Sequence, residues 1–316
     1  MAATASPATT GSPAPAGRLP LTRGRITALA IGVPIALVLV ANAAFSLLAP
    51  FAEGRYPVSY TAPAATRSLT MATSGGHVTV TPTTADRVTL NGTAHYSFIH
   101  STLTEQTTGG DTAVNYHCAP LPSSNCGLDA TLHVPVSLPV SVSTDGGDAS
   151  VSGISAPVTM HSAGGNLSAD HVTGLLNLST DGGNLQLSTV TAPVTESTGG
   201  GDIGAADLGP ATVTFHTEGG NIQATGVTSG QVTASTGGGD IEIVFTRVPR
   251  DVHVDTSGGN ITLVLPPGTE QYNVNAHTDG GTVSDGLSQS SNSPHKISAT
   301  SGGGDITLRQ QPRPQQ

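Results

Sequence analysis

Two cysteines have the most readily predicted chemistry in this 316-residue chain. Cys118 and Cys126 enclose the short segment APLPSSN. In an extracytoplasmic region, two cysteines at this spacing are expected to form a disulfide that closes a small loop. Free thiols are the alternative. A metal site would need further ligands nearby, and His117 alone does not supply them.

A column of Asp and Asn residues is the second chemical signal. It follows a recurring Gly-Gly pair by two residues and offers oxygen atoms that could bind calcium. Calcium-binding parallel β-rolls use the pattern G-G-x-G-x-D-x-U-x with a period of about nine residues. Here the pairs recur at intervals of 18 residues or more. We therefore expect a structural ladder between stacked strands and no specific metal or cofactor, with weak, diffuse cation attraction left open.

Histidines and serines form no catalytic motif. His161, His216 and His277 share one repeat position, three residues before the glycine pair, which strand alternation directs outward. No H-E-x-x-H motif occurs, and no G-x-S-x-G lies on a strand-to-helix turn. A convergent Ser-His-Asp triad stays open. We expect that the chain is not an enzyme.

A solenoid polysaccharide lyase is the nearest enzymatic alternative. Such an enzyme would stack sugars on exposed aromatic residues. The repeats from Pro139 onward contain only three aromatic residues, Phe215, Phe245 and Tyr272. Phe215 occupies an inward repeat position, so we expect it in the core.

Basic residues are rare within the repeats and occur in longer segments. Between Val88 and the C-terminal tail, the only Lys or Arg residues are Arg247, Arg250 and Lys296. The later repeats carry extra residues in FTRVPRD (245–251), LPPGTEQYN (265–273) and DGLSQSSNSPHK (285–296). Insertions into a solenoid emerge as loops on one face, and loops on a rigid scaffold often bind ligands. The candidate binding residues are therefore Arg247, Arg250, Tyr272 and Lys296, against the alternative that the insertions are merely tolerated.

A Gly-Gly pair organises most of the chain. Thr or Ser stands two residues before its first glycine, an aliphatic residue six before it, and Asp or Asn two after it in all but one copy. Counted from the first glycine, the inward positions are even-numbered before the pair and the apolar positions are odd-numbered after it. Because side chains alternate along a strand, this shift by one residue indicates a corner between two strands. We expect that this corner uses the positive φ that glycine accepts. The first glycines of the regular copies are Gly146, Gly164, Gly182, Gly200, Gly219, Gly238, Gly258, Gly280 and Gly303, with looser copies at Gly75 and Gly109.

Such copies cannot bury an apolar face alone, so they must stack. We expect an all-β fold, a parallel β-solenoid of about nine Gly-Gly-cornered rungs over 140–308, after a less regular N-terminal β cap over 68–139. An antiparallel sandwich also has recurring strands and turns, but identical residues at identical repeat positions favour the solenoid. Stacking predicts that Ile222 faces the interior and that Gln223 points outward.

The repeats also resemble a known family. The matching stretches include VTMHSAGGNLSA, VTESTGGGDIGA, VTASTGGGDIEI and ISATSGGGDITL, and LHVPVSLPVSVSTDGGDASV resembles the family's usual entry into its repeats. Residues 68–308 are similar to the bacterial putative-adhesin family of β-strand-repeat proteins of unknown function. The resemblance implies surface adhesion and supplies no catalytic residues. The doubled glycine departs from the family's single Gly-Asp and leaves the ligand open.

The N-terminal region reads as a membrane anchor. Residues 26–51 carry no charge and are long enough, at ~1.5 Å per residue, to cross ~30 Å of hydrocarbon. Arginines precede this segment and the first acid, Glu53, follows it, which places the repeats outside the cytoplasm. A signal peptide cleaved after Ala43 is the alternative to this signal anchor. The flanking segments are a disordered cytoplasmic tail (1–25), a linker (52–67) and a disordered C-terminal tail (309–316).

Charge limits the partners. The chain has 11 Lys and Arg against 21 Asp and Glu, and nucleic-acid binding needs clustered basic residues, so we expect no nucleic-acid partner. We expect a single-pass cell-membrane protein, held in lipid by one transmembrane helix, whose extracellular repeats bind a surface glycan or matrix protein as an adhesin or scaffold. The alternatives are a regulator of envelope-stress signalling, which the short cytoplasmic tail disfavours, and the lyase-like enzyme.

Overall fold

The computed structural model describes residues 23–48, 53–97, 99–118, 126–209 and 211–312, and it divides the chain into units 1–48 and 49–316. In the first unit the described element is helix α1 (Arg23–Leu48), which contains Pro34. Within the part of the chain searched, which is limited to these residues, no helix combines the length and the apolar character needed to cross a membrane. The expected terminal tails fall mostly on 1–22 and 313–316, outside the described residues.

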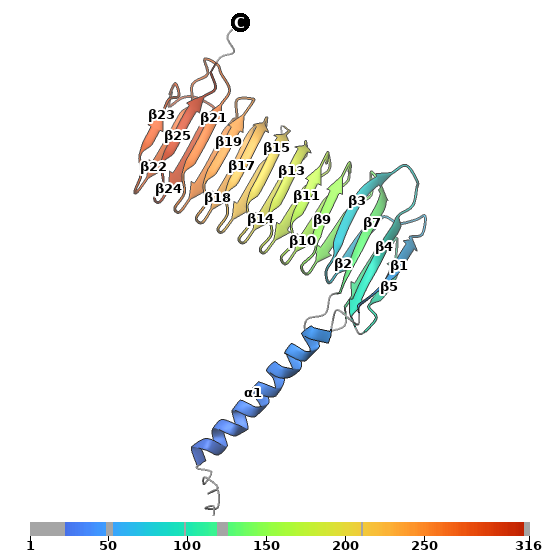
Figure 1. The fold of residues 1–316 in the computed structure, drawn as a ribbon. Helices are drawn as coiled ribbons and strands as arrows, with labels where there is room; N and C mark the ends of the chain where they lie inside the picture. Colours follow the sequence, from blue (N-terminus) through green and yellow to red (C-terminus); the bar gives the residue numbers. More distant parts are fainter. Residues whose placement is uncertain (1–22, 49–52, 98, 119–125, 210, 313–316) are drawn as a thin grey trace, which may run out of the picture. The chain divides into compact units, whose positions relative to one another are not determined.

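The second unit consists of two sheets, and from β6 onward successive strands of the chain alternate between them (Figure 1). From residue 140 onward, each rung contributes one strand to each sheet, and all strand pairs in this region are parallel, so the antiparallel sandwich is wrong. The 13-stranded sheet includes β9 (Asp148–Ser152), β11 (Leu167–Asp170), β13 (Leu185–Val190), β15 (Ile203–Leu208), β17 (Ile222–Val227), β19 (Ile241–Phe245), β21 (Ile261–Leu265), β23 (Val283–Asp285) and β25 (Ile306–Gln310). The 12-stranded sheet includes β8 (Val140–Thr144), β10 (Val158–Ser162), β12 (Leu176–Thr180), β14 (Val194–Thr198), β16 (Val213–Thr217), β18 (Gln231–Thr236), β20 (Asp251–Thr256), β22 (Asn273–Thr278) and β24 (Lys296–Ser301).

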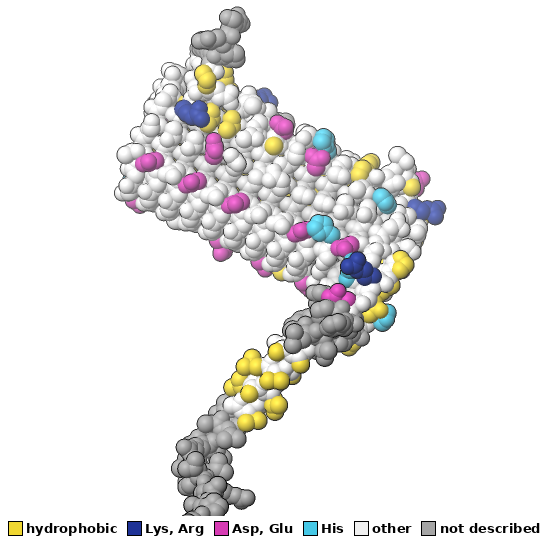
Figure 2. Space-filling model, viewed as in Figure 1, with side chains coloured by type: hydrophobic (Ala, Val, Ile, Leu, Met, Phe, Trp, Pro, Cys, Tyr) yellow, Lys and Arg dark blue, Asp and Glu magenta, His cyan; other side chains and the backbone are white. Residues whose placement is uncertain are grey.

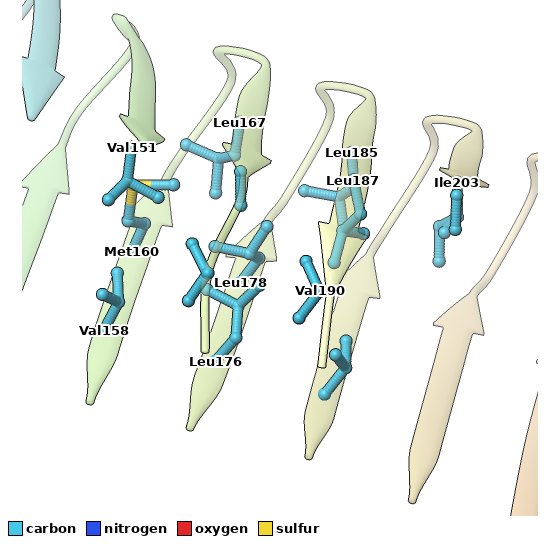
Figure 3. Close-up of a cluster of buried hydrophobic side chains, with 14 of the residues drawn as sticks. Val151, Val158, Met160, Leu167, Leu176, Leu178, Leu185, Leu187, Val190 and Ile203 are labelled. Atoms are coloured by element: carbon cyan, nitrogen blue, oxygen red, sulfur yellow. The ribbon is translucent and has the colours of Figure 1, made fainter. Parts of the chain in front are cut away.

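The parallel register stacks like residues on like. Ile222 lies opposite Ile203 on one side and Ile241 on the other, and all three are buried. The next residue, Gln223, is exposed, so the predicted alternation is confirmed. Figure 3 shows the aliphatic side chains of neighbouring rungs gathered between the two sheets. Because each rung adds a similar aliphatic set, the core is a continuous column that needs few aromatic residues.

We call the Gly-Gly turn of each rung the first corner and the return turn to the next rung the second corner. A Cβ on Gly183, the second glycine of its pair, would collide with the carbonyl oxygen of Gly165 in the preceding rung, whereas a Cβ on Gly182 would meet nothing within 4 Å. No glycine pair in the rungs from 140 onward has a positive φ. The expectation of positive φ at these corners is therefore wrong. The second glycine is required because two backbones approach closely there.

A column of hydroxyl groups closes the first corner. The Thr198 hydroxyl donates to the carbonyl oxygen of Gly183 in the preceding rung at 2.8 Å and accepts the N–H of Gly201 in its own rung at 3.1 Å. The single oxygen atom of a Thr or Ser hydroxyl can both donate and accept, which explains why Thr or Ser recurs at this position. The same bridge recurs at Thr180, Thr217, Thr236, Thr256, Thr278 and Ser301.

The rungs do not stack in chain order at either end. At the C-terminal end, β24 pairs with β20 and β25 with β21, while β22 and β23 lie outside them. At the N-terminal end, β2 (Ser68–Thr73) and β3 (His77–Thr83) lie between the β8–β9 rung and the rung of β6 (Asp111–His117) and β7 (Gly127–Pro135). In both places one rung is inserted between two others. The connection from β21 to β22 is long because it must pass the rung that is inserted later.

Antiparallel strands form the N-terminal cap. β4 (Thr89–Ser97) pairs antiparallel with both β7 and β1 (Glu53–Thr61). β5 (Thr102–Thr108) forms an antiparallel hairpin with β6. Both sheets therefore end in antiparallel strands at this end of the unit.

The expected linker over 52–67 is wrong, because strand β1 occupies more than half of it. Tyr56, Val58 and Tyr60 alternate toward the core, which is the pattern of a half-buried strand. Pro57 hides this pattern in the sequence. The structure accommodates Pro57 because β1 is an edge strand, where a residue without an N–H breaks no ladder.

Candidate functional site

The Asp and Asn column forms a hydrogen-bonded ladder along the first corners. The N–H of Asn184 donates to the Oδ1 atom of Asn166 at 2.9 Å, and the N–H of Asp202 donates to the Oδ1 atom of Asn184 at 2.8 Å. Each side-chain oxygen thus accepts a backbone N–H of the next rung. In the described residues, no group of three or more His, Cys, Asp or Glu side chains could hold a metal ion. The column acts in the structure as a ladder.

Acidic residues are never neighbours in this ladder. Like charges directly opposite on adjacent strands are destabilising, and intervening asparagine or histidine residues avoid that repulsion. Figure 2 shows the acidic side chains as separate spots on a mostly uncharged face. Near one end, the N–H and hydroxyl of Thr282 hold the pKa of the Asp305 carboxyl below its ordinary value. In spatial order the ladder reads Asp129, His77, Asp148, Asn166, Asn184, Asp202, Asn221, Asp240, Asn260, Asp305 and Thr282.

The rung of β6 and β7 carries a disulfide where the regular rungs have a glycine pair. Cys118 and Cys126 are joined, and their Cα atoms lie 5.9 Å apart. Residues 119–125 lie outside the described residues. The N–H of Leu128 donates to the carbonyl oxygen of Gly75 at 2.9 Å, which ties this corner to the next rung. The disulfide thus closes the first corner of the terminal rung.

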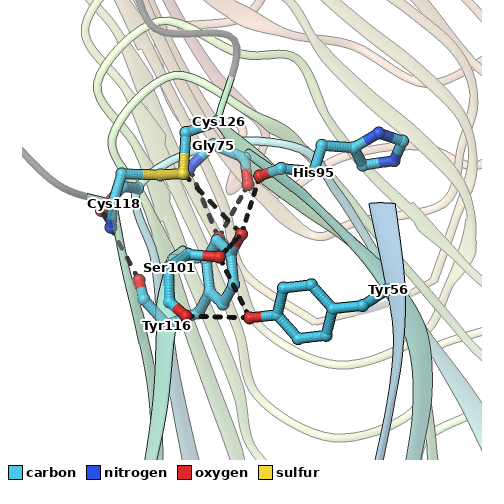
Figure 4. Close-up of a disulfide and its surroundings, with 9 residues drawn as sticks. Tyr56, Gly75, His95, Ser101, Tyr116, Cys118 and Cys126 are labelled. Atoms are coloured by element: carbon cyan, nitrogen blue, oxygen red, sulfur yellow. Dashed lines mark hydrogen bonds between the residues drawn. A yellow bond between two sulfur atoms is a disulfide. The ribbon is translucent and has the colours of Figure 1, made fainter. Parts of the chain in front are cut away.

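A tyrosine network surrounds the disulfide (Figure 4). Tyr116 lies opposite Thr73 and so takes the place of the corner hydroxyl. Its oxygen lies 3.0 Å from the carbonyl oxygen of His95 and 2.5 Å from the hydroxyl of Ser101. The Tyr56 hydroxyl donates to the Ser101 carbonyl oxygen at 2.9 Å. Burial raises the pKa of Tyr116, and the network reads as a structural cap.

The three longer connections of the later rungs meet at the second corners. The N–H of Tyr272 donates to the carbonyl oxygen of Ser288 at 2.9 Å, which joins the second connection to the third. His295 Nδ1 lies 2.8 Å from the carbonyl oxygen of Pro249, which joins the third connection to the first. Rung insertion causes this meeting, because it places β24 directly beside β20. The three connections span residues 245–251, 265–273 and 285–296.

A cleft of about 490 Å³ lies along these second corners. The backbone of Arg250 is fixed within it, because its N–H donates to the Gly230 carbonyl oxygen at 2.9 Å and its carbonyl oxygen accepts the Lys296 N–H at 2.8 Å. Four neighbouring rungs line the cleft. The lining residues are Thr212 before β16, Thr228 and Gly230 before β18, Gln231 at the start of β18, Arg247, Val248 and Arg250 before β20, and Pro294 and His295 before β24.

The candidate binding residues divide into two groups. Arg247 and Arg250 line the cleft, and Lys296 is an exposed residue directly after His295. Tyr272 is 0% exposed, so its ring is not available to a ligand. It packs 6.0 Å from the ring of His295, measured between centroids, and burial raises the pKa of its hydroxyl.

Of the nine residues that line the cleft, sequence reasoning singled out only Arg247 and Arg250 as binding residues. His295 was detectable, because it stands beside Lys296 in the same insertion. Thr228 and Gln231 carried no signal, since Thr and Gln occur at many exposed positions of the repeats.

Glu196 interrupts the aliphatic core. It is 0% exposed and lies opposite Leu178 and Phe215. Neither carboxyl oxygen has a hydrogen-bond partner among the described residues. Burial raises the pKa of its carboxyl well above the ordinary value, so we read this group as protonated in the fold. Its inward position is visible in the sequence, four residues before Gly200.

No curated protein matches the sequence. A putative cell adhesion protein from Clostridium sporogenes ATCC 15579 is 12% identical, over 81% of this chain and 100% of that chain, with a TM-score of 0.23. A putative adhesin from Bacteroides fragilis NCTC 9343 is 15% identical, over 82% of this chain and 97% of that chain, with a TM-score of 0.45. The family model Toastrack DUF4097 matches residues 121–309, more than half of the sequence, and the chain therefore belongs to the Toastrack DUF4097 family.

Proposed function

We propose that this chain is a membrane-anchored, extracytoplasmic β-repeat protein that binds a partner at the cell surface, as an adhesin-like scaffold without catalysis. The proposal joins three parts: an anchor at the N-terminus, a location outside the cytoplasm and a binding surface on the repeats.

The chemistry of helix α1 supports the anchor. Consecutive residues of a helix point in different directions, so a run of four apolar residues presents apolar surface on all sides. Arginines precede the uncharged segment 26–51 and acids follow it, which favours an extracytoplasmic repeat unit. Over residues 32–44, the part of α1 whose side chains are described, the exposed large apolar side chains are Val33, Ile35, Leu37, Val38, Leu39 and Val40.

The disulfide supports the location. Disulfides form and persist in oxidising compartments outside the cytoplasm. Cys118 and Cys126 close the terminal rung, so an oxidising compartment would preserve the cap. Topology and disulfide thus point to the same side of the membrane.

The cleft across four second corners is the observation that carries the binding role. Its residues come from neighbouring rungs whose backbones are locked in two sheets. Binding residues on loops gain affinity when a rigid scaffold holds them in place. A stacked array of this kind presents such loops on one side without moving the core.

Protease treatment of intact, wall-stripped cells tests the anchor and its orientation. We expect added protease to remove the repeats and to leave a short N-terminal fragment in the membrane fraction. Protection of the whole chain in intact cells, with digestion only after lysis, would contradict the proposed orientation. Retention of purified full-length chain on immobilised surface glycans or matrix proteins tests the binding role, and retention on none of them would contradict it.

A further inference from the structure

We propose that the second-corner cleft binds an anionic glycan, a sugar chain with carboxylate or phosphate groups, through Arg247 and Arg250. This inference rests on the surface-binding function proposed above and names the class of its ligand. Charge, assembly and lining of the cleft each support it.

The cleft gathers positive charge on an acidic protein. From residue 53 onward the chain contains all of its 21 Asp and Glu residues. The ion pairs of the described residues all involve histidine, so Arg247, Arg250 and Lys296 have no ion-pair partner there. A guanidinium group presents a planar fork of N–H donors that matches carboxylate and phosphate oxygens. Two unpaired guanidinium groups in one cleft therefore select for an anion.

Rung insertion assembles this charge from distant parts of the chain. The insertion of β24 beside β20 brings Lys296 next to Arg250, 46 positions earlier in the chain, and the Lys296 N–H donates to the Arg250 carbonyl oxygen at 2.8 Å. His295 is held from two sides, by the carbonyl oxygen of Pro249 at 2.8 Å and by the ring of Tyr272. A cleft formed in this way is preorganised, because its backbone positions are fixed by the two sheets before a ligand arrives.

The neutral lining fits a sugar better than a peptide or a simple ion. Thr212 donates from its hydroxyl to the Oε1 atom of Gln231 at 3.4 Å, which leaves the amide N–H groups of Gln231 for a ligand. Val248 and Pro294 add apolar surface. Hydroxyl, amide and apolar groups beside arginines complement the hydroxyls, ring carbons and acid group of an acidic sugar. The cleft volume of about 490 Å³ lies within the range of roughly 300–1,000 Å³ for small-ligand sites.

The number of charges argues against nucleic acid. A DNA-binding surface typically neutralises roughly six to ten phosphates, and this cleft has Arg247, Arg250 and neighbouring Lys296. The acidic ladder on the first corners would repel a long polyanion that wrapped the unit. A short anionic segment held at one place avoids that repulsion.

Calorimetric titration of the full-length chain in a non-ionic detergent tests the inference. The probes are an oligogalacturonate, which carries carboxylates, an oligomer of glycerol phosphate, which carries phosphates, a neutral oligoglucan and oligoglutamate. We expect at least one acidic oligomer with hydroxyl groups to bind, more weakly at high salt. Arg250→Ala should weaken binding about tenfold, and Arg247→Ala with Arg250→Ala more, because each removes a charge-assisted contact. Arg250→Lys should fall between Arg250→Ala and the native chain, since it keeps the charge and loses the fork.

Arg87→Ala is the matched control, because Arg87 is an exposed arginine between β3 and β4 at the other end of the unit. It should leave binding unchanged. Absence of binding by both acidic oligomers, binding unaffected by the double substitution, or equal binding of oligoglutamate would overturn the inference. Arginine-independent retention of the chain on a neutral glycan or a matrix protein would overturn it while leaving the proposed surface-binding function intact.

Discussion

Both corners of each rung turn the chain from one sheet to the other, but they differ in how much sequence variation they accept. At the first corner, glycine, hydroxyl and amide columns contact their counterparts in the neighbouring rungs, so each rung constrains the next. At or just before the second corner, five rungs use a residue with left-handed φ, and later rungs use loops of different length. The five residues are Gly153 and His171, which follow their strands, and Thr189, Asp207 and Gly226, which are the last but one residues of β13, β15 and β17. In this solenoid, the residues and length of the second corner vary while those of the first corner stay nearly constant. The cleft lies at the corner that is free to vary.

Gly183→Ala should produce the largest effect on this comparison. A Cβ at Gly183 would collide with the Gly165 carbonyl oxygen, so the rungs must separate locally. We expect a loss of about 3 kcal/mol in the free energy of unfolding. The matched change Gly182→Ala places its Cβ in open space and should change stability by less than about 0.5 kcal/mol. Urea unfolding followed by circular dichroism measures both, and equal losses would contradict the stacking account of the first corner.

Glu196, a buried residue of β14, should make the stability of the fold depend on pH. Strand β14 leads into a first corner. Burial raises the pKa of the Glu196 carboxyl in the folded chain above its ordinary value of 4.5. Above pH 4.5 the unfolded chain therefore releases a proton that the folded chain keeps. The contribution of Glu196 to the free energy of unfolding should be fully present below pH 4.5. It should fall as the pH rises toward the raised pKa, by up to about 1.4 kcal/mol per pH unit. Glu196→Leu should remove this slope and stabilise the fold at neutral pH. Its neighbour in the preceding rung is Leu178, so a leucine fits the column.

Glu218→Leu is the control for that experiment, because Glu218 is exposed. It should leave the slope of stability with pH as it is in the native chain. A slope that persists in Glu196→Leu would show that other groups cause it.

Thr189→Gly should produce the smallest effect, at the end of β13 just before a second corner. Thr189 has φ of 53°, a conformation that costs a β-branched residue about 1–2 kcal/mol. Glycine removes this strain but adds entropy to the unfolded chain, so we expect a gain of about 0.5 kcal/mol. Ser188→Gly, one residue earlier in β13, should instead destabilise by a similar amount, because it relieves no such strain. A loss in Thr189→Gly as large as in Ser188→Gly, measured as a urea midpoint, would contradict strain at this corner.

The sequence predicts which side chains of a rung face inward better than it predicts the order in which the rungs stack. Ile222 and Gln223 face the expected sides because strand alternation and copy alignment are local properties. The insertion of β24 and β25 could not be read, because each rung presents similar edges to its neighbours. Only the length of the connection over 265–273 hints at it. The same limit hid the cleft, whose residues become neighbours through that insertion.

Two sequence-based predictions, the positive φ of the glycine pairs and Tyr272 as a binding residue, were wrong for physical reasons. The glycine pair suggested positive φ, yet the structure uses glycine for close approach, and a sequence does not distinguish these two needs. Tyr272 stood in a polar insertion and suggested an exposed ring, yet the meeting of the insertions buries it. In both cases the deciding contact comes from a neighbouring rung.

Hydrogen exchange of the full-length chain, followed by mass spectrometry of its peptides, tests the contrast between corners most directly. First-corner N–H groups such as those of Asn184 and Asp202 are bonded to side-chain oxygens, so peptides that cover these corners should exchange slowly. The N–H groups of Arg247 and Val248 have no such acceptor in the described part of the chain, whereas those of Thr246 and Arg250 donate to the carbonyl oxygens of Val227 and Gly230. The Arg247 and Val248 amides in the peptide over 246–250 should therefore exchange quickly and slow down when an acidic oligomer binds. Equal exchange at both corners, or ligand protection at the first corners, would contradict the division of the solenoid into a fixed corner and a binding corner.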